Sequence, residues 1–175
     1  GWEDVALKSL LEKKLGMREE LDNDVNAMTL AEHKFGAGKG TKNIVCVTLG
    51  TGVGGGIVIE GKIYRGGSMA AGEIGHMPLN EIGPLCNCGG RACLERYIGN
   101  KYILDRARIA LGRDITLEKV SKLAASGNKK ALDIWEDVGR KLGIALTQVV
   151  NLLNPDKIII GGGISEAGKF ILEPA

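Results

Sequence analysis

The stretch Gly72–Glu95, which reads GEIGHMPLNEIGPLCNCGGRACLE, constrains the fold of this chain more than any other segment. It holds one histidine and three of the four cysteines in the spacing H-x9-C-x-C-x4-C: His76, Cys86, Cys88 and Cys93. One imidazole and three thiolates form the ligand set of a closed, four-coordinate structural zinc site. The intervening residues are rich in Gly, Pro and Asn and show no apolar periodicity, so they can bend around a metal. The sequence therefore predicts a structural zinc ion here.

Two other interpretations of these cysteines stay open. Cys86 and Cys88 are too close in sequence to bridge each other easily, and a disulfide among three clustered thiols leaves one unpaired. The segment could also be a bare turn with incidental thiols. A closed metal site has no open position for catalysis, so the flanking carboxylates, Glu73 and Glu95, become candidates for substrate binding. The alternative for each is a solvated surface charge, which is where most glutamates lie.

The length of 175 residues fits one domain or a large piece of one, and we interpret residues 1–175 as a single truncated domain. The hydrophobic fraction of 44% supports a proper core, and the net charge of +2 implies no strong attraction to nucleic acid or membrane. Cys46 lies in an apolar run and is expected to be a buried core thiol. We see no signal peptide and no membrane-spanning run, and the cysteine usage fits a reducing compartment, so a cytoplasmic location is expected. The start without Met and the stop soon after a new apolar segment indicate a piece of a longer protein.

Periodicity and capping residues predict an alternation of helices and strands. Helices are expected over 2–15, 25–35, 93–111, 116–126 and 128–153, the last two capped by Thr116 and Asn128. Strands are expected over 43–50, 55–60, 62–65 and 156–160, the first three forming an antiparallel meander, and 17–21 is an ambiguous strand candidate.

Two glycine-rich segments are candidate ligand contacts. Leu49–Gly56 (LGTGVGGG) joins two strands, and its backbone N–H groups, with the Thr51 hydroxyl, could converge on a phosphate. The alternative is a glycine-rich hairpin without a ligand. Ile158–Gly163 (IIIGGG) ends a strand in three glycines, which favours close backbone approach to a nucleotide over an ordinary turn. The first segment matches neither the Rossmann nor the Walker pattern.

Asn23 and Asp24 stand where a helix is expected to begin. An Asp at this place is most often an N-cap. It could also accept the proton of a hydroxyl that attacks phosphorus, with Asn23 bonding a neighbouring hydroxyl. His33, farther along the same helix, is expected to be an exposed bystander, and the basic residues of 101–113 are expected to form a solvated helix face.

Four segments together resemble the ROK family, which groups bacterial sugar kinases with sugar-responsive repressors. They are NDVNA, LGTGVGGGIVIEGKIYRGGSMAAGEIGHM, CNCGGRACLE and IIIGGG, with Ala92 standing where the family usually has Gly. The resemblance implies an α/β, ribonuclease H-like ATPase fold of the actin and hexokinase type, with this chain as most of the C-terminal lobe, including its zinc-binding loop. The N-terminal lobe's D-x-G-x-T phosphate loop, with its Mg²⁺-associated Asp, is not found in the sequence.

The resemblance also implies roles for single residues. Asp24 would be the general base; the sugar would be bound by Asn23, Asp24, Glu73, His76 and Glu95. Nucleotide contacts would come from Thr51, Gly52, Gly162 and Gly163, the first two on the ATP phosphates. The zinc ligands would be His76, Cys86, Cys88 and Cys93.

The function implied is that of a glucokinase, which transfers phosphate from MgATP to the primary hydroxyl of glucose, although a fragment alone is expected to be inactive. Related kinases for fructose, allose or N-acetylated hexosamines share much of this set, as does the sugar-sensing half of a ROK repressor. A homodimer is expected, with no membrane partner and no nucleic acid unless a repressor domain precedes the chain. A third hypothesis is a zinc-knuckle interaction module. The near-neutral charge and the few aromatic residues argue against nucleic acid as the ligand of such a module.

Overall fold

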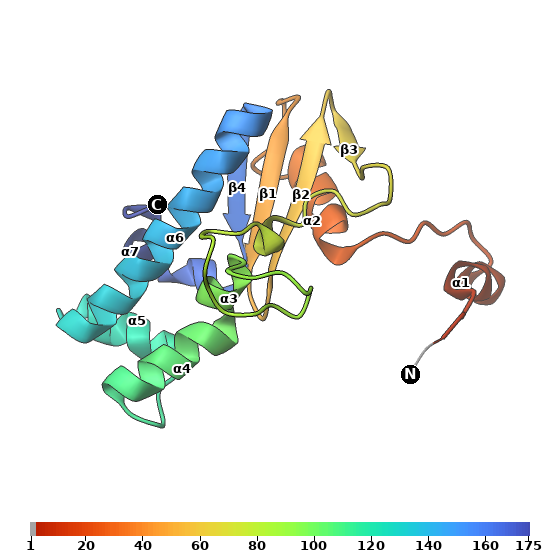
Figure 1. Ribbon diagram of the computed structural model, residues 1–175. Coiled ribbons are helices and arrows are strands. Elements are labelled where there is room, and N and C mark those ends of the chain that lie inside the picture. Colours follow the sequence, from red (N-terminus) through yellow and green to blue (C-terminus); the bar gives the residue numbers. More distant parts are fainter. Residues whose placement is uncertain (1–2) are drawn as a thin grey trace.

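A computed structural model describes residues 3–175 and shows a four-stranded sheet in the order β3-β2-β1-β4 (Figure 1). β1 (Ile44–Leu49), β2 (Val53–Ile59) and β3 (Lys62–Tyr64) form the predicted antiparallel meander. β4 (Lys157–Gly161) returns from a distant part of the chain and pairs in parallel with β1. The predictions of these four strands are therefore confirmed, except that β2 begins two residues before the predicted start at 55.

Side chains of β1 alternate between two hydrophobic layers, as a strand covered on both faces requires. Val45, Val47 and Leu49 belong to the main core with the long helix α6 (Lys129–Leu153). Ile44 and Cys46 face the other way and pack with residues that include Met28 of α2 (Asp24–Lys34). Figure 1 shows α2 and α6 on opposite faces of the sheet. The buried Cys46 confirms the predicted core thiol.

The long helix α6 carries the main core and has the predicted caps. The side chain of Asn128 accepts a hydrogen bond from the Ala131 N–H, and Asn154 ends the helix in a left-handed conformation with φ 42°. Four helices lie on the α6 side of the molecule: α3 (Glu95–Ile98), α4 (Asn100–Leu111), α5 (Leu117–Ala125) and α7 (Lys169–Leu172). The predicted helix over 93–111 is interrupted at Gly99, and Thr116 caps α5 as predicted.

Four predictions need correction. The segment 17–21 forms no strand. The first helix, α1 (Leu7–Leu15), begins at Leu7 and not at the predicted residue 2, which itself lies outside the described residues. His33 is buried rather than exposed, and its Nε2 lies 2.9 Å from the Thr41 carbonyl oxygen, a hydrogen-bond partner that the sequence did not reveal. Arg106 is not on a solvated face: it pairs with Asp137 and donates to the Tyr97 carbonyl, which joins α3, α4 and α6.

α1 stands apart from the rest of the molecule at the end of an extended segment (Figure 1). None of its residues is buried. Within 3–175, no helix combines the length and the apolar character needed to cross a membrane.

Glycines of β2 explain how tightly α2 approaches the sheet. A Cβ on Gly54 would lie 2.6 Å from Val25 Cγ2, and one on Gly56 would lie 2.1 Å from Thr29 Oγ1. Gly55 points to the opposite face, where a Cβ would meet the carbonyl oxygen of Gly72 at 2.3 Å. The run Gly54–Gly56 is therefore strand backbone that is packed on both sides, and the loop predicted over 49–56 is reduced to the short turn between β1 and β2.

We expect Gly56→Ala to lower the free energy of unfolding by about 1–3 kcal/mol, because the added methyl group forces α2 away from β2. Gly67→Ala is the matched control, since no atom of the described residues, its chain neighbours aside, lies within 4 Å of a Cβ placed there. Chemical denaturation of both variants measures the difference. Equal stabilities would contradict the close packing of α2 on β2.

Candidate functional site

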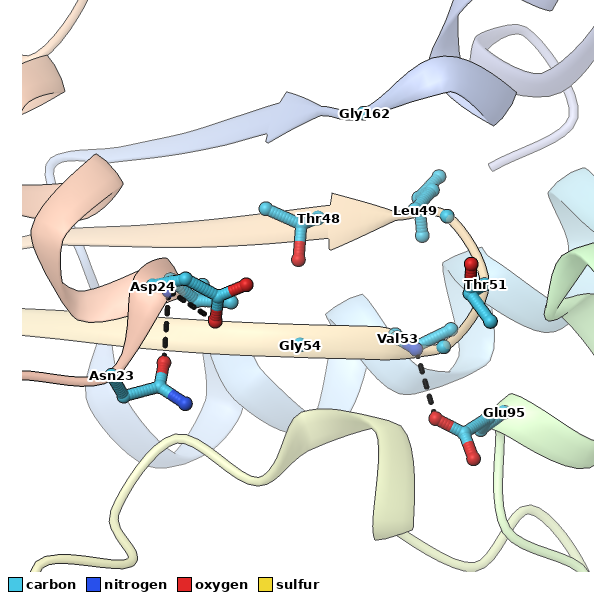
Figure 2. Close-up of a pocket in the computed structure, with 12 residues that line it drawn as sticks. Asn23, Asp24, Thr48, Leu49, Thr51, Val53, Gly54, Glu95 and Gly162 are labelled. Atoms are coloured by element: carbon cyan, nitrogen blue, oxygen red, sulfur yellow. Dashed lines mark hydrogen bonds between the residues drawn. The ribbon is translucent and has the colours of Figure 1, made fainter. Parts of the chain in front are cut away.

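A pocket of about 410 Å³ opens where β1 turns into β2, beside the start of α2 (Figure 2). The polar side chains around it come from α2, β1, the β1–β2 turn and α3. Its lining residues are Asn23, Asp24, Val25, Thr48, Leu49, Gly50, Thr51, Gly52, Val53, Gly54, Glu95 and Gly162. Six residues that the sequence singles out for substrate or nucleotide binding thus meet in one place: Asn23, Asp24, Thr51, Gly52, Glu95 and Gly162.

The start of α2 presents Asp24 to this pocket. Asn23, and not Asp24, is the N-cap: its Oδ1 accepts from the N–H groups of Val25 at 2.8 Å and Asn26 at 3.3 Å. Asp24 is then the first residue of the helix, and within residues 3–175 its exposed carboxylate accepts a hydrogen bond only from the neighbouring Val25 N–H, at 2.9 Å. The positive end of the helix dipole also favours a negative charge at this position.

The turn between β1 and β2 holds Glu95 against the pocket. Oε2 of Glu95 accepts a hydrogen bond of 3.0 Å from the Val53 N–H (Figure 2). A Cβ on Gly52 would lie 2.4 Å from the same oxygen, so glycine is what allows the carboxylate this close. One carboxylate oxygen is thereby fixed, and Oε1 remains available to a ligand.

The four predicted metal ligands converge. One ligand atom from each of His76, Cys86, Cys88 and Cys93 lies within 4.8 Å of every other. His76 Nδ1 is 3.6 Å from Cys86 Sγ, and Cys88 Sγ is 3.6 Å from Cys93 Sγ. Zinc–sulfur bonds of about 2.3 Å at tetrahedral angles place ligand atoms about 3.8 Å apart, so this cluster fits a tetrahedral metal.

The thiols have unequal proton affinities. Burial, together with the neighbouring thiols, raises the pKa of Cys93 to about 12, whereas the Gly90 N–H lowers the pKa of Cys88. A bound cation overrides this difference, because a coordinating thiol loses its proton. The chemistry of the donor set therefore suits a metal that prefers sulfur.

The loop that carries the four predicted ligands, residues 76–93, is called the metal loop, and it lies against the strand that borders the pocket. The loop's ends are joined by hydrogen bonds from Leu94 N to Met77 O and from Leu79 N to Ala92 O. A Cβ on Gly75 would lie 2.0 Å from the Val53 carbonyl oxygen, so the turn that carries His76 rests directly on β2. Within this loop, the buried Ala92 has a left-handed backbone, with φ 55°.

His76 and Glu73 flank the pocket without lining it. With His76 Nδ1 facing the sulfur cluster, its Nε2 lies 3.9 Å from a carboxylate oxygen of Glu73. Glu73 itself borders a separate apolar cleft of about 310 Å³, beside the end of α6. The structure thus brings these two residues together but does not place them among the residues that surround Asp24.

Gly162 and Gly163, both predicted to contact the nucleotide, line different cavities. Gly162 lines the main pocket, and its φ of 91° and close contact with Leu49 require glycine. Gly163 instead lines a neighbouring cavity of about 400 Å³ with residues that include Asn100 and Thr116.

Sequence reasoning missed Thr48 as a pocket residue. It lies one residue before the end of β1, and its hydroxyl is on the face that α2 covers (Figure 2). The available signal was a single hydroxyl residue in an otherwise apolar strand, IVCVTL.

Comparison with known proteins gives a consistent result. The model of the ROK family matches residues 1–174. The glucokinase of Halalkalibacterium halodurans is 40% identical over 189 residues, which cover 99% of this chain and 57% of that protein. The xylose repressor of Bacillus subtilis is 34% identical over 171 residues, which cover 98% of this chain and 44% of that protein.

Solved structures agree on the fold. The crystal structure of a ROK family glucokinase from Streptomyces griseus, in complex with glucose and AMPPNP, matches with a TM-score of 0.86 and 33% identity. The match covers 99% of this chain and 61% of that chain, so the present sequence spans less than two thirds of these relatives. The predicted α/β fold of the actin and hexokinase type is confirmed, and the chain belongs to the ROK family.

Proposed function

We propose that the protein containing this chain is an ATP-dependent hexose kinase that phosphorylates the primary hydroxyl of glucose. The observation that carries the proposal is the placement of Asp24 and Glu95 in one pocket with the β1–β2 turn. The glucokinase relatives and the glucose and AMPPNP complex support the same assignment.

The chemistry of the pocket favours a neutral polyhydroxyl ligand next to Asp24. Its side chains offer two carboxylates, an amide and two threonine hydroxyls, and none of the lining residues within 3–175 is Lys or Arg. Carboxylates accept hydrogen bonds from sugar hydroxyls, whereas they repel a free phosphate. The phosphates of ATP would therefore need their Mg²⁺ and the backbone N–H groups near Thr51 and Gly52.

In the proposed mechanism, Asp24 orients the primary hydroxyl and accepts its proton as that oxygen attacks the γ-phosphorus. The bond between the γ-phosphorus and the bridging oxygen breaks, and ADP leaves with that electron pair. Asn23, Glu73, His76 and Glu95 hold other hydroxyls of the sugar. Gly162 and Gly163 lie on the nucleotide side. The protein contributes mainly position and charge stabilisation.

We further propose that the four-ligand cluster binds zinc and that the metal has a structural role. Three sulfurs and one nitrogen at tetrahedral spacing favour this ion, and they leave no open coordination position. The metal would orient His76 through Nδ1, so that its Nε2–H can donate to a sugar hydroxyl.

A second candidate function is the sugar-sensing half of a transcriptional repressor. The similarity to the xylose repressor over nearly the whole chain is the observation that favours it. A repressor senses the sugar without transferring phosphate, so a coupled assay of the full-length protein with ATP and a panel of hexoses separates the two functions. Sugar binding without product formation would favour the repressor.

We expect Asp24→Asn in the full-length protein to lower kcat by about 10²–10⁴-fold, because the amide cannot accept the hydroxyl proton. Glucose affinity should change little, since the side chain keeps its shape. Asp133→Asn, at an exposed position on α6, is the matched control. Turnover within a few-fold of the parent would refute the role of Asp24.

Metal analysis should find one zinc per chain, lost in Cys93→Ser and retained in Cys46→Ala, which removes a thiol outside the cluster. Complete chelation should weaken glucose binding by about 10–100-fold, because His76 loses its orientation. Calorimetry of the holo and metal-free proteins measures this change. Equal glucose affinity in verified metal-free protein would argue against the coupling.

A further inference from the structure

Arg65 connects the edge of the sheet to the start of α2. It follows directly after β3, and its Nη2 and Nε lie 2.5 and 3.0 Å from Oδ2 of Asp22. Asp22 stands two residues before Asp24. The side chains of Arg65 and Asp22 are only 34% and 16% exposed, so solvent screens this pair less than an ordinary surface pair.

The second oxygen of Asp22 organises the residues that follow it. Oδ1 accepts from the Asn23 backbone N–H and from Asn26 Nδ2, each at 2.9 Å. Burial alone would raise the pKa of Asp22, but the hydrogen bonds from Arg65 and Asn26 outweigh it and lower the pKa. The carboxylate is therefore ionised at neutral pH and receives four hydrogen bonds.

The Asp22 carboxylate fixes the orientation of the Asn26 side-chain amide, with Nδ2 toward Asp22. The Asn26 side chain is buried, with 4% exposure, and a flipped amide would point a carbonyl oxygen at the negative charge of Asp22. No donor within residues 3–175 reaches the other end of the amide, Oδ1. The contact with Asp22 is thus the only side-chain hydrogen bond that holds Asn26 in the described part of the chain.

We propose that the Arg65–Asp22 pair is a positioning device that sets Asn23 and Asp24 at the mouth of the pocket. Asp22 holds the Asn23 N–H, and Asn23 in turn caps the helix at Val25. Asp24 has no hydrogen bond of its own to the sheet within the described residues. Packing of Val25 on Gly54 brings the helix to the pocket, and this chain of contacts sets the orientation of its first residues. The inference rests on the proposed role of Asp24, since a displacement of about 1 Å in a catalytic group costs about 10²-fold in rate.

Arg65→Met in the full-length protein should lower kcat by about 10–100-fold and leave the KM for ATP within about threefold. Arg65→Lys, which keeps the charge but loses the planar fork, should recover part of the rate. Arg140→Met is the control, since Arg140 pairs with Glu136 on an exposed face of α6. An Arg65→Met rate equal to that of the control would overturn the proposal.

A double-mutant cycle separates positioning from general destabilisation. In the Asp24→Asn background, Arg65→Met should cost less than about a further twofold in kcat, because the group that it positions is already inactive. A further loss as large as that in the parent would show that Arg65 acts elsewhere, and would overturn the proposal.

Amide hydrogen exchange tests the same inference without activity. The N–H groups of Val25 and Asn26 donate to Asn23 Oδ1, so they should exchange about tenfold faster in Arg65→Met and unchanged in Arg140→Met. Unchanged exchange in folded Arg65→Met would overturn the positioning role whatever the assay shows. Faster exchange in a protein that phosphorylates no sugar would support the positioning and reject the kinase.

Discussion

The close approach of α2 to β2 is the contact on which the site depends. Because Gly54 and Gly56 have no side chains, Val25 and Thr29 rest directly on the strand backbone. This contact brings the start of α2 to the point where β1 turns into β2. The helix end with its partial positive charge, the turn and Glu95 then surround one pocket, although they come from separate parts of the chain.

Val53 joins the two halves of the site in a similar way. Its N–H binds the Glu95 carboxylate, and its carbonyl group packs against Gly75, one residue before His76. The metal loop is therefore held against the first residue of β2 from two directions. In the proposed kinase, this arrangement lets a structural metal influence sugar binding although no metal ligand lines the pocket around Asp24.

Local signals in the sequence predicted much of this structure. Thr116 and Asn128 cap helices as their types predict, and the spacing of His76 and the cysteines anticipated a cluster that the fold brings together. Tertiary contacts were harder to predict. The burial of His33 depends on the Thr41 carbonyl group, and the bond between Arg65 and Asp22 joins residues 43 positions apart. The glycine-rich loop was predicted too long, because composition cannot distinguish glycines of a loop from glycines of a strand that another element touches.

The backbone of Ala92 has a consequence for how the metal loop behaves. A left-handed conformation costs an L-residue with a Cβ about 1–2 kcal/mol. Ala92 keeps this conformation at a buried position between Cys88 and Cys93 in the sequence, and its N–H donates to the Pro84 carbonyl oxygen. Strain of this kind persists only where the surroundings over-determine the geometry. In the proposed zinc site, coordination on both sides of Ala92 would supply that constraint, and the energy stored there would be released on loss of the ion. Ion loss and relaxation of the segment would then reinforce each other, so the loop would behave as a cooperative unit that is either fully assembled or open.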